Sequence, residues 1–454
     1  MFRKLLSPAP QIRNRLNSDP PNILCISPAF VPRHDSEAFC SAKFVAAVAD
    51  AGASISVFTY RAFGSQLDDG SASWQALGKY VADFPVPSGW NPIQSLSRAV
   101  RYQTRQCARW IGAAVEEAKR IHSLRPFDVV YSRSLPMFAH IAGYWCAKSL
   151  EVPWIAGIND PWDWHLFPVK VANRVPIPLA VSTFWMKRTI RCADLVIYPN
   201  SRLHAYHERL SGINHDSLII PHVGIASNEA IQADAPSKTF TMVHAGKVGS
   251  SEATGRSAAP LLRGLRLFVE DFPEAAEITR LIFVGPSDQA IESLVSELQL
   301  TANVRSVGRV TYQESLKFIR GAAVCVLVEA QMQEGIFLPS KLVDYVSAKK
   351  PVLALSPKVG VVNDMAESFG ILRVDSGDVE AVRRAIASLY VDFRNRTLSL
   401  RGSNQEQVSQ FEPGSVATTF LTAFRNLDQS KRVGSKSRPN YKIGTDTTPD
   451  VLVK

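Results

Sequence analysis

Short apolar runs alternate along the chain with stretches in which apolar residues recur every three or four positions. A run of this length predicts a buried strand, and the three-to-four spacing predicts an amphipathic helix. Repeated strand–helix units predict an α/β fold with parallel sheets. The expected strands lie at 22–27, 54–60, 128–132, 153–159, 194–198, 217–220, 240–245, 280–284, 304–307, 323–328, 352–355 and 370–374.

The alternation stops at ASNEAIQADAPSK (226–238), which has the polar composition of a linker, and restarts after it. We therefore predict two Rossmann-like, doubly wound domains that face a cleft. The predicted boundaries are a flexible basic arm (1–20), a first domain (21–226), a linker (227–238), a second domain (239–403), a final helix (404–427) and a disordered tail (428–454).

The stretch EGIFLPSKLVDYVSAKKPVLAL (334–355) predicts a loop, a helix and a strand. Pro339 closes the loop, and Ser340 suits the N-cap position of the helix. A helix N-terminus attracts phosphate, and Lys341 adds a cation there. Asp344, one turn further on, can accept hydrogen bonds from sugar hydroxyls. The pattern fits a nucleotide-sugar pocket or an ordinary capped surface helix, and the residues alone favour the surface helix.

Other candidates follow two expected strands. Gly246 lets a ligand approach the backbone closely, and Lys247 and Arg256 place two cations near the same sheet edge. With the helix start at 340 they could surround a diphosphate, although most lysines and arginines are simply solvated. In the first half, Asp160 opens a Trp-rich turn at a strand end, where α/β sheets place ligands. A turn that only caps the core is the alternative.

The net charge of +10 suggests nucleic acid, an anionic membrane surface or phosphorylated substrates as partners. No nucleic-acid-binding motif is present, so that class is the least supported. The basic, apolar segments 98–125 and 170–191 are typical of membrane-surface helices, of solvated helix faces or of core helices. No apolar run is long enough to span a bilayer, and the N-terminus lacks a secretory signal. Six scattered cysteines predict a reducing compartment without disulfides or a zinc site.

The chain resembles the retaining GT-B glycosyltransferases of family four, particularly bacterial members of polysaccharide assembly. The resemblance covers most of residues 22–427 and is most specific in LPSKLVDYVSAKKPVLAL. It continues in HAGKVGS, GRSAAPLL and VGRVTYQESLKFIRGAAVCVLV, and in the amino half through NILCISPAFVP, PWIAGINDPW and ADLVIYPNS. It implies an acceptor domain, a nucleotide-sugar domain and a C-terminal helix that crosses back to the first domain.

The resemblance also assigns roles to residues. Lys247 and Arg256 would hold the diphosphate of a UDP- or GDP-linked sugar, and Asp160 would lie near the acceptor; these are the implied catalytic residues. The resemblance also implies a set of donor-site residues, which would contact the donor from the helix start, at its ribose, at its base or from nearby loops. They are Gly246, Gly285, Gly308, Arg309, Glu334, Pro339, Ser340, Lys341, Leu342 and Asp344.

Two positions depart from the family pattern. Asp344 stands where the family usually has Glu, and Ile336 stands at a second position that is usually Glu. Glu334 is the nearby carboxylate that could take this second role. The implied reaction is front-face displacement with retention, in which cations neutralise the departing diphosphate. No metal or other cofactor is expected, and the sequence contains no Asp-x-Asp motif.

Three functions fit these observations. The first is a glycosyltransferase of cell-surface polysaccharide synthesis that uses a saccharide or polyprenyl-linked acceptor. This enzyme would be cytoplasmic and peripheral on the inner face of the plasma membrane, with no nucleic-acid partner. The second is a catalytically degenerate GT-B scaffold at the membrane. The third is a GT-B sugar-nucleotide epimerase.

Overall fold

The computed structural model describes residues 20–60, 76–82, 105–162, 176–227, 238–247, 255–286 and 289–432. All twelve expected strands are present in these ranges, and they form two six-stranded sheets. The first sheet contains β1 (Asn22–Ile26), β2 (Ser54–Phe58), β3 (Val129–Arg133), β4 (Trp154–Gly157), β5 (Leu195–Tyr198) and β6 (Ser217–Ile219). The second contains β7 (Phe240–Ala245), β8 (Thr279–Val284), β9 (Val304–Ser306), β10 (Val324–Val328), β11 (Val352–Leu355) and β12 (Ile371–Val374).

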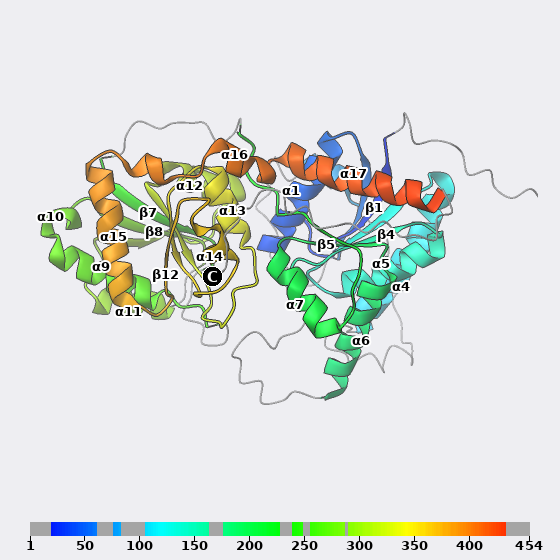
Figure 1. The fold of residues 1–454 in the computed structure, drawn as a ribbon, viewed down its shortest axis with the longest axis horizontal. Coiled ribbons are helices and arrows are strands. Elements are labelled where there is room, and N and C mark those ends of the chain that lie inside the picture. The colour runs from blue at the N-terminus through cyan, green and yellow to red at the C-terminus, as the bar shows by residue number, and fades with distance from the viewer. Residues whose placement is uncertain are drawn as a thin grey trace, which may run out of the picture.

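Both sheets are parallel and doubly wound. The strand orders are β2-β1-β3-β4-β5-β6 and β12-β11-β10-β7-β8-β9. The order reverses between β1 and β3 in the first sheet and between β7 and β10 in the second. Ligands of open α/β sheets bind at the carboxyl ends of the strands beside such a reversal. The predicted fold of two Rossmann-like domains is confirmed, and Figure 1 shows the two lobes side by side.

Helices cover both faces of each sheet, which explains why central strands such as β1 and β10 are buried at every position. The first domain contains α1 (Ser36–Asp50), η1 (Ala76–Tyr80), α4 (Arg105–Leu124), α5 (Phe138–Leu150), α6 (Pro176–Cys192) and α7 (Ser201–Ser211). The second contains α9 (Ala259–Asp271), α10 (Pro273–Ala276), α11 (Gln289–Glu297), α12 (Tyr312–Gly321), α13 (Ser340–Ser347), α14 (Val361–Ala366) and α15 (Val379–Arg394). The chain continues through η3 (Leu398–Arg401), α16 (Gln405–Val408), η4 (Ser409–Phe411) and α17 (Pro413–Arg432).

The last helix, α17, returns to the first domain, as the sequence resemblance implied (Figure 1). Phe420 of α17 is fully buried. Its ring lies 5.0 Å from that of Phe44 on α1 and 4.8 Å from that of Tyr131 on β3, between ring centroids. The helix extends to Arg432, past the predicted end at 427, because its last turn is polar and is invisible to an apolar pattern.

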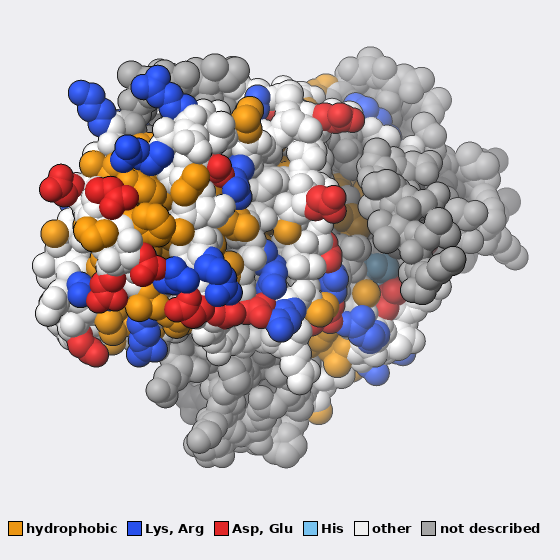
Figure 2. Space-filling model, turned by 60° about the vertical axis from the view of Figure 1, so that its left-hand side comes forward, with side chains coloured by type: hydrophobic (Ala, Val, Ile, Leu, Met, Phe, Trp, Pro, Cys, Tyr) orange, Lys and Arg blue, Asp and Glu red, His pale blue; other side chains and the backbone are white. Residues whose placement is uncertain are grey.

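Basic and acidic side chains are interspersed over the described part of the surface in Figure 2. Ion pairs also form on helices of the second domain. Arg266 pairs with Glu270 at 2.8 Å on α9, and Arg383 pairs with Glu380 at 2.8 Å on α15. The positive net charge therefore does not gather into a one-sign patch on this described face. Among the described helices, none has the length and apolar character required to cross a membrane.

Candidate functional site

A cavity of about 730 Å³ lies between the two domains, at the carboxyl ends of their strands. This volume is in the range of small-molecule sites. The first domain contributes the loop after β1 and the first turns of α1, and the second contributes the ends of β7 and β8 and the starts of α12 and α13. The cavity brings together eight of the predicted site residues: Gly246, Lys247, Arg256, Gly285, Arg309, Ser340, Lys341 and Asp344.

Two glycines allow the loops after β7 and β8 to pack backbone against backbone. Gly246 and Gly285 have positive φ angles of 94° and 145°. A Cβ atom on Gly285 would lie 2.6 Å from the carbonyl oxygen of Gly246, too close for any side chain. Gly308 supports the same region, because it pairs with Gly285 through an isolated β-bridge beside Arg309. These glycines shape the cavity wall.

Lys341 enters the cavity from the first turn of α13. Its Nζ lies 3.3 Å from Nε2 of His244, the neighbour of the last residue of β7. His244 donates from Nδ1 to the carbonyl oxygen of Val326 at 3.0 Å, so its Nε2 carries the lone pair that accepts from Lys341. Burial and the charge of Arg256 lower the pKa of Lys341 to about 7. A bound anion would favour the charged form of this amine.

The start of α13 differs in detail from the prediction. Pro339, rather than Ser340, is the N-cap, because its backbone is extended and helical geometry begins at Ser340. The amide of Leu342 already donates to the carbonyl oxygen of Pro339 at 2.9 Å, and its side chain is fully buried. Leu342 therefore belongs to the core. Ser340 and Lys341 are the first-turn residues that line the cavity.

Three further cations line the cavity. Lys247 and Arg256 are exposed, at the end of β7 and before α9. Arg309 reaches toward the first domain, where its Nη1 lies 3.2 Å from Nδ1 of His34. His34 in turn donates from Nε2 to the carbonyl oxygen of Val310 at 3.0 Å. With Lys341, these side chains make the second-domain wall of the cavity strongly positive.

Asp344 is engaged by a residue that the sequence did not single out. Lys43 of α1 lies with Nζ 2.7 Å from Oδ1 of Asp344, and both side chains are about one-tenth exposed. Burial opposes the charge on Lys43, but the neighbouring carboxylate raises its pKa. Tyr312 lies beside the pair, with its ring 5.5 Å from Nζ of Lys43. The predicted ribose-binding carboxylate thus forms an ion pair across the cleft.

Glu334 lies outside the residues that line the cavity. Its carboxylate pairs with Arg202 at 2.7 Å and with Arg209 at 3.4 Å, both on α7. Glu334 points toward α7 because Ile336, two residues further along the loop, is buried. Ile336 packs into a cluster of first-domain residues that includes Trp162. The Ile336 carbonyl oxygen also accepts from Nδ2 of Asn200 at 3.1 Å. The loop therefore joins the two domains and directs Glu334 toward α7.

Two neighbouring carboxyl groups of the first domain, Asp160 and Glu37, lie outside the residues that line the cavity. Asp160 follows β4, and burial raises its pKa to about 6. Burial and the charge of Asp160 raise the pKa of Glu37 to about 8, while Arg133 opposes this shift. Glu37 accepts from the amide of Leu135 at 3.3 Å and from Nδ2 of Asn159 at 3.4 Å. Asp160 was predicted, whereas Glu37 was missed.

Arg133 and Glu329 were also missed, although their positions at strand ends were a usable signal. Arg133, the last residue of β3, is buried and donates from Nη1 to the Tyr131 hydroxyl at 3.0 Å. Its Nε has no hydrogen-bond partner among the described residues. Glu329 directly follows β10 and is 7% exposed. Burial raises its pKa to about 8, and Arg256 opposes the shift. Both residues border the strand-order reversals of their sheets.

Comparison with solved structures defines the fold class. No protein-family model matches the chain, and no curated protein matches its sequence. HepE of Anabaena, in complex with UDP and glucose, is similar with a TM-score of 0.61 and 12% identity, over 89% of this chain and 99% of that chain. Sucrose-phosphate synthase of Thermosynechococcus elongatus has a TM-score of 0.62 and 18% identity, over 90% of this chain and 100% of that one.

A UDP-N-acetylglucosamine 2-epimerase is similar with a TM-score of 0.52 and 12% identity, over 92% of this chain and 99% of that chain. These identities are low, so the likeness concerns the fold. The chain has the two-domain GT-B fold that these structures share, with its cavity at the junction of the two domains.

Proposed function

We propose that this protein is a glycosyltransferase that moves a sugar from a UDP- or GDP-linked donor to a saccharide or lipid-linked acceptor. One observation carries the proposal: Lys247, Arg256, Arg309 and Lys341 line one cavity at the strand-order reversal of the second sheet. Positive side chains at a helix start suit a diphosphate. HepE, a structure with the same fold, was crystallised with UDP-glucose.

In this proposal the donor diphosphate lies between Lys247, Arg256 and the first turn of α13. The bond between the anomeric carbon and the diphosphate oxygen breaks, and a bond to the acceptor oxygen forms on the same face of the sugar. The acceptor proton passes to the departing diphosphate oxygen. The cations stabilise the negative charge that develops on this leaving group, which is electrostatic catalysis without a metal ion.

The ribose of the donor would meet Asp344 on α13. The Asp344 carboxylate is 2.7 Å from Lys43. A bound ribose would therefore either hydrogen-bond to Asp344 alongside Lys43 or displace Lys43 from it. The acceptor would enter from the first domain, where Glu37 and Asp160 lie close enough for their charges to interact. A carboxyl pair of raised pKa can orient an acceptor hydroxyl through hydrogen bonds. Because the new bond would form on the face from which the diphosphate leaves, the configuration at the anomeric carbon would be retained, as the family resemblance implies.

A lipid-linked acceptor would require contact with a membrane, and an aromatic patch on α5 and α6 supports this part of the proposal. Trp145 and Phe184 are 41% and 53% exposed. Lys148 lies 5.4 Å from the Trp145 ring, and Arg188 lies 5.8 Å from the Phe184 ring. Exposed aromatic side chains beside cations are typical of surfaces that bind anionic lipid. The protein would then work at the inner face of the plasma membrane.

Nucleotide binding tests the donor site. A panel of UDP, GDP, ADP and their sugars is screened by thermal shift, and the best ligand is titrated by calorimetry against wild type, Lys247→Ala and Arg256→Ala. We expect each variant to bind at least about tenfold more weakly, since a charge-assisted contact contributes roughly 1.5–3 kcal/mol. Arg266→Ala, which replaces a half-buried arginine on α9 that is paired with Glu270, is the control. Unchanged affinity in both cavity variants would remove the site assignment.

Product analysis separates the proposed transferase from its alternatives. A transferase gives a glycosylated product only when the acceptor is present. A sugar-nucleotide epimerase, favoured by the carboxyl groups of raised pKa at Glu37, Asp160 and Glu329, converts the donor alone. A scaffold binds nucleotide without turnover, or binds none. Flotation with vesicles rich in phosphatidylglycerol, using wild type and Phe184→Ser, tests the membrane contact independently.

A further inference from the structure

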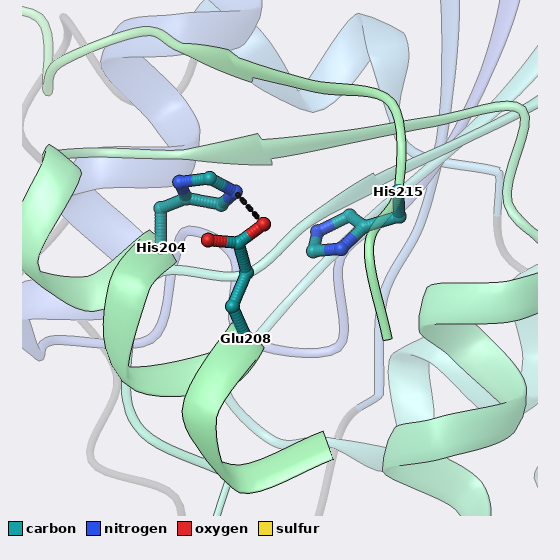
Figure 3. Close-up of side chains that lie close together, drawn as sticks. All are labelled: His204, Glu208 and His215. Atoms are coloured by element: carbon teal, nitrogen blue, oxygen red, sulfur yellow. Dashed lines mark ion pairs between the residues drawn. The ribbon is translucent and has the colours of Figure 1, made fainter. Parts of the chain in front are cut away.

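Two histidines and a glutamate meet outside the lining of the cavity, beside the edge strand β6 of the first-domain sheet (Figure 3). His204 and Glu208 lie one turn apart on α7, and His215 belongs to the loop that leads into β6. One potential ligand atom from each side chain lies within 4.8 Å of the others. Figure 3 shows the carboxylate of Glu208 between the two imidazole rings.

Local structure explains why these side chains meet. Residues four apart on a helix share a face, so His204 and Glu208 project together. Gly212 then ends α7 in the left-handed conformation, which turns the chain back along the helix. This turn returns His215 to the same face, with its ring 5.4 Å from that of His204. The cluster is therefore built by α7 and its own C-terminal loop.

The dimensions suit a small tetrahedral cation. Bonds of about 2.0–2.1 Å to zinc in tetrahedral geometry place ligand atoms about 3.4 Å apart. Nε2 of His204 and Oε1 of Glu208 are already 3.5 Å apart. His215 must approach by a small side-chain movement to complete the set. Glu208 is 38% exposed, so water can supply a fourth ligand and the cation has a path of entry.

Hydrogen bonds orient both rings. His215 lies with Nδ1 3.1 Å from the carbonyl oxygen of Ile213, which can only accept, so Nδ1 carries the proton and Nε2 the lone pair. A backbone carbonyl that fixes the ring in this way is a recurring feature of histidine metal ligands. Nε2 of His215 meets the Tyr198 hydroxyl at 3.0 Å, and Nε2 of His204 meets the Ser217 hydroxyl at 3.0 Å. The Ser217 hydroxyl can rotate away when His204 coordinates a cation, whereas the Tyr198 ring is buried, so the His215 ring must turn from the Tyr198 hydroxyl to present Nε2.

We propose that His204, Glu208 and His215 bind one Zn²⁺ ion, with water as the fourth ligand. Two imidazoles and a carboxylate favour Zn²⁺ over the hard cation Mg²⁺. The ion would fasten the loop at 213–216 to α7, whose first residues hold the second domain through Asn200 and Arg202. This site is separate from the proposed sugar-transfer chemistry, and its role would be to stiffen the helix that joins the domains.

Metal binding to the full chain, with any affinity tag removed, tests the proposal. Zinc content is measured after dialysis, and Co²⁺ is titrated as a visible-light reporter of coordination geometry. We expect one ion per chain, a tetrahedral Co²⁺ spectrum, a higher melting temperature with Zn²⁺ and no effect of Mg²⁺. Glu208→Gln and His215→Asn should each weaken Zn²⁺ binding at least about 100-fold, more than the 10–100-fold typical of outer-shell changes.

Two further variants keep the test decisive. His122→Asn replaces a partly buried histidine on α4 of the same domain and should bind Zn²⁺ like wild type. Tyr198→Phe removes the hydroxyl that competes for Nε2 of His215, so it should bind Zn²⁺ as tightly as wild type or more tightly. If the three side chains serve only a hydrogen-bond network, wild type binds no stoichiometric Zn²⁺, or His215→Asn binds it equally well, and the proposal is overturned.

Discussion

Nζ of Lys43 lies 2.7 Å from Oδ1 of Asp344, and this buried ion pair joins α1 of the first domain to α13 of the second. The contact lies in the wall of the cavity, where both residues are among the lining side chains. The contact between the two domains and the proposed donor site therefore share one carboxylate.

Breaking this pair should destabilise the protein strongly. Lys43→Met keeps an apolar stem but leaves Asp344 as an uncompensated buried charge, a loss of about 3–5 kcal/mol. Asp344→Asn should have a similar effect, and the double variant should lose less than the sum of the two. A double-mutant cycle from urea unfolding measures the coupling, expected at about 1–3 kcal/mol. Additive effects would show that the two side chains do not interact in solution.

Nucleotide-sugar affinity should fall as the pH rises through 7. The free pKa of Lys341 is about 7, lowered by burial and Arg256, and a bound diphosphate raises it. Binding therefore takes up a proton above pH 7, and linkage predicts a loss of up to about tenfold in affinity per pH unit. Calorimetry from pH 6 to 8.5 measures this slope.

The ligand for this experiment is a nucleotide sugar rather than a free nucleoside diphosphate. A terminal phosphate has its second pKa near 6 and would add its own pH dependence, whereas the diphosphate of a nucleotide sugar stays fully ionised. Lys341→Met removes the titrating amine and should give weaker but nearly pH-independent binding. The same slope in wild type and Lys341→Met would assign the proton uptake to another group.

Replacing Glu37 should stabilise the protein at alkaline pH. Burial and the Asp160 charge raise the pKa of Glu37 to about 8, above the value near 4.3 of an unfolded chain. The folded state then binds more protons than the unfolded state, so stability falls as the pH rises from about 4 to about 8. Glu37→Gln removes this loss. We expect its melting temperature to exceed that of wild type at pH 8.5 by about 2 °C or more, and to match it at pH 4.5.

A surface glutamate provides the comparison for this prediction. Glu116→Gln on α4 removes a carboxylate that is 73% exposed and paired with Lys119. Such exposed pairs contribute at most about 1 kcal/mol, so this variant should follow wild type at every pH. A gain at pH 8.5 in both variants would point to net charge instead of burial at Glu37.

Gly285→Ala should disturb the cavity wall. The residue has φ of +145°, and a Cβ atom would lie 2.6 Å from the rigid backbone oxygen of Gly246. We expect a loss of roughly 1–3 kcal/mol in the free energy of unfolding, together with weaker nucleotide binding. Gly112→Ala on α4 is the matched control, since a Cβ atom there meets nothing within 4 Å. That variant should gain about 0.5–1 kcal/mol, because alanine favours a helix. Equal effects of both changes would contradict the steric argument.

The sequence by itself determined the local elements and the fold class. Strands such as β10 and β11 are buried on both faces of a parallel sheet, so they are apolar throughout and are easy to recognise. The rule that ligands bind at the carboxyl ends of strands also singled out Lys247 and Arg256, and both line the cavity. Arg133 at the end of β3 and Glu329 after β10 satisfy the same rule.

Only the tertiary structure decided which distant side chains face each other. Lys43 and Asp344 are separated by 301 positions, and no local pattern relates an α1 lysine to an α13 carboxylate. The direction of Glu334 likewise depends on Ile336, which is buried against the other domain. Contacts between the domains join residues that are far apart in the sequence. Their effects on side-chain charge and pKa therefore arise only when the two domains pack together. The sequence therefore predicted a diphosphate site, and the structure decided which distant side chains meet at the cavity proposed to hold it.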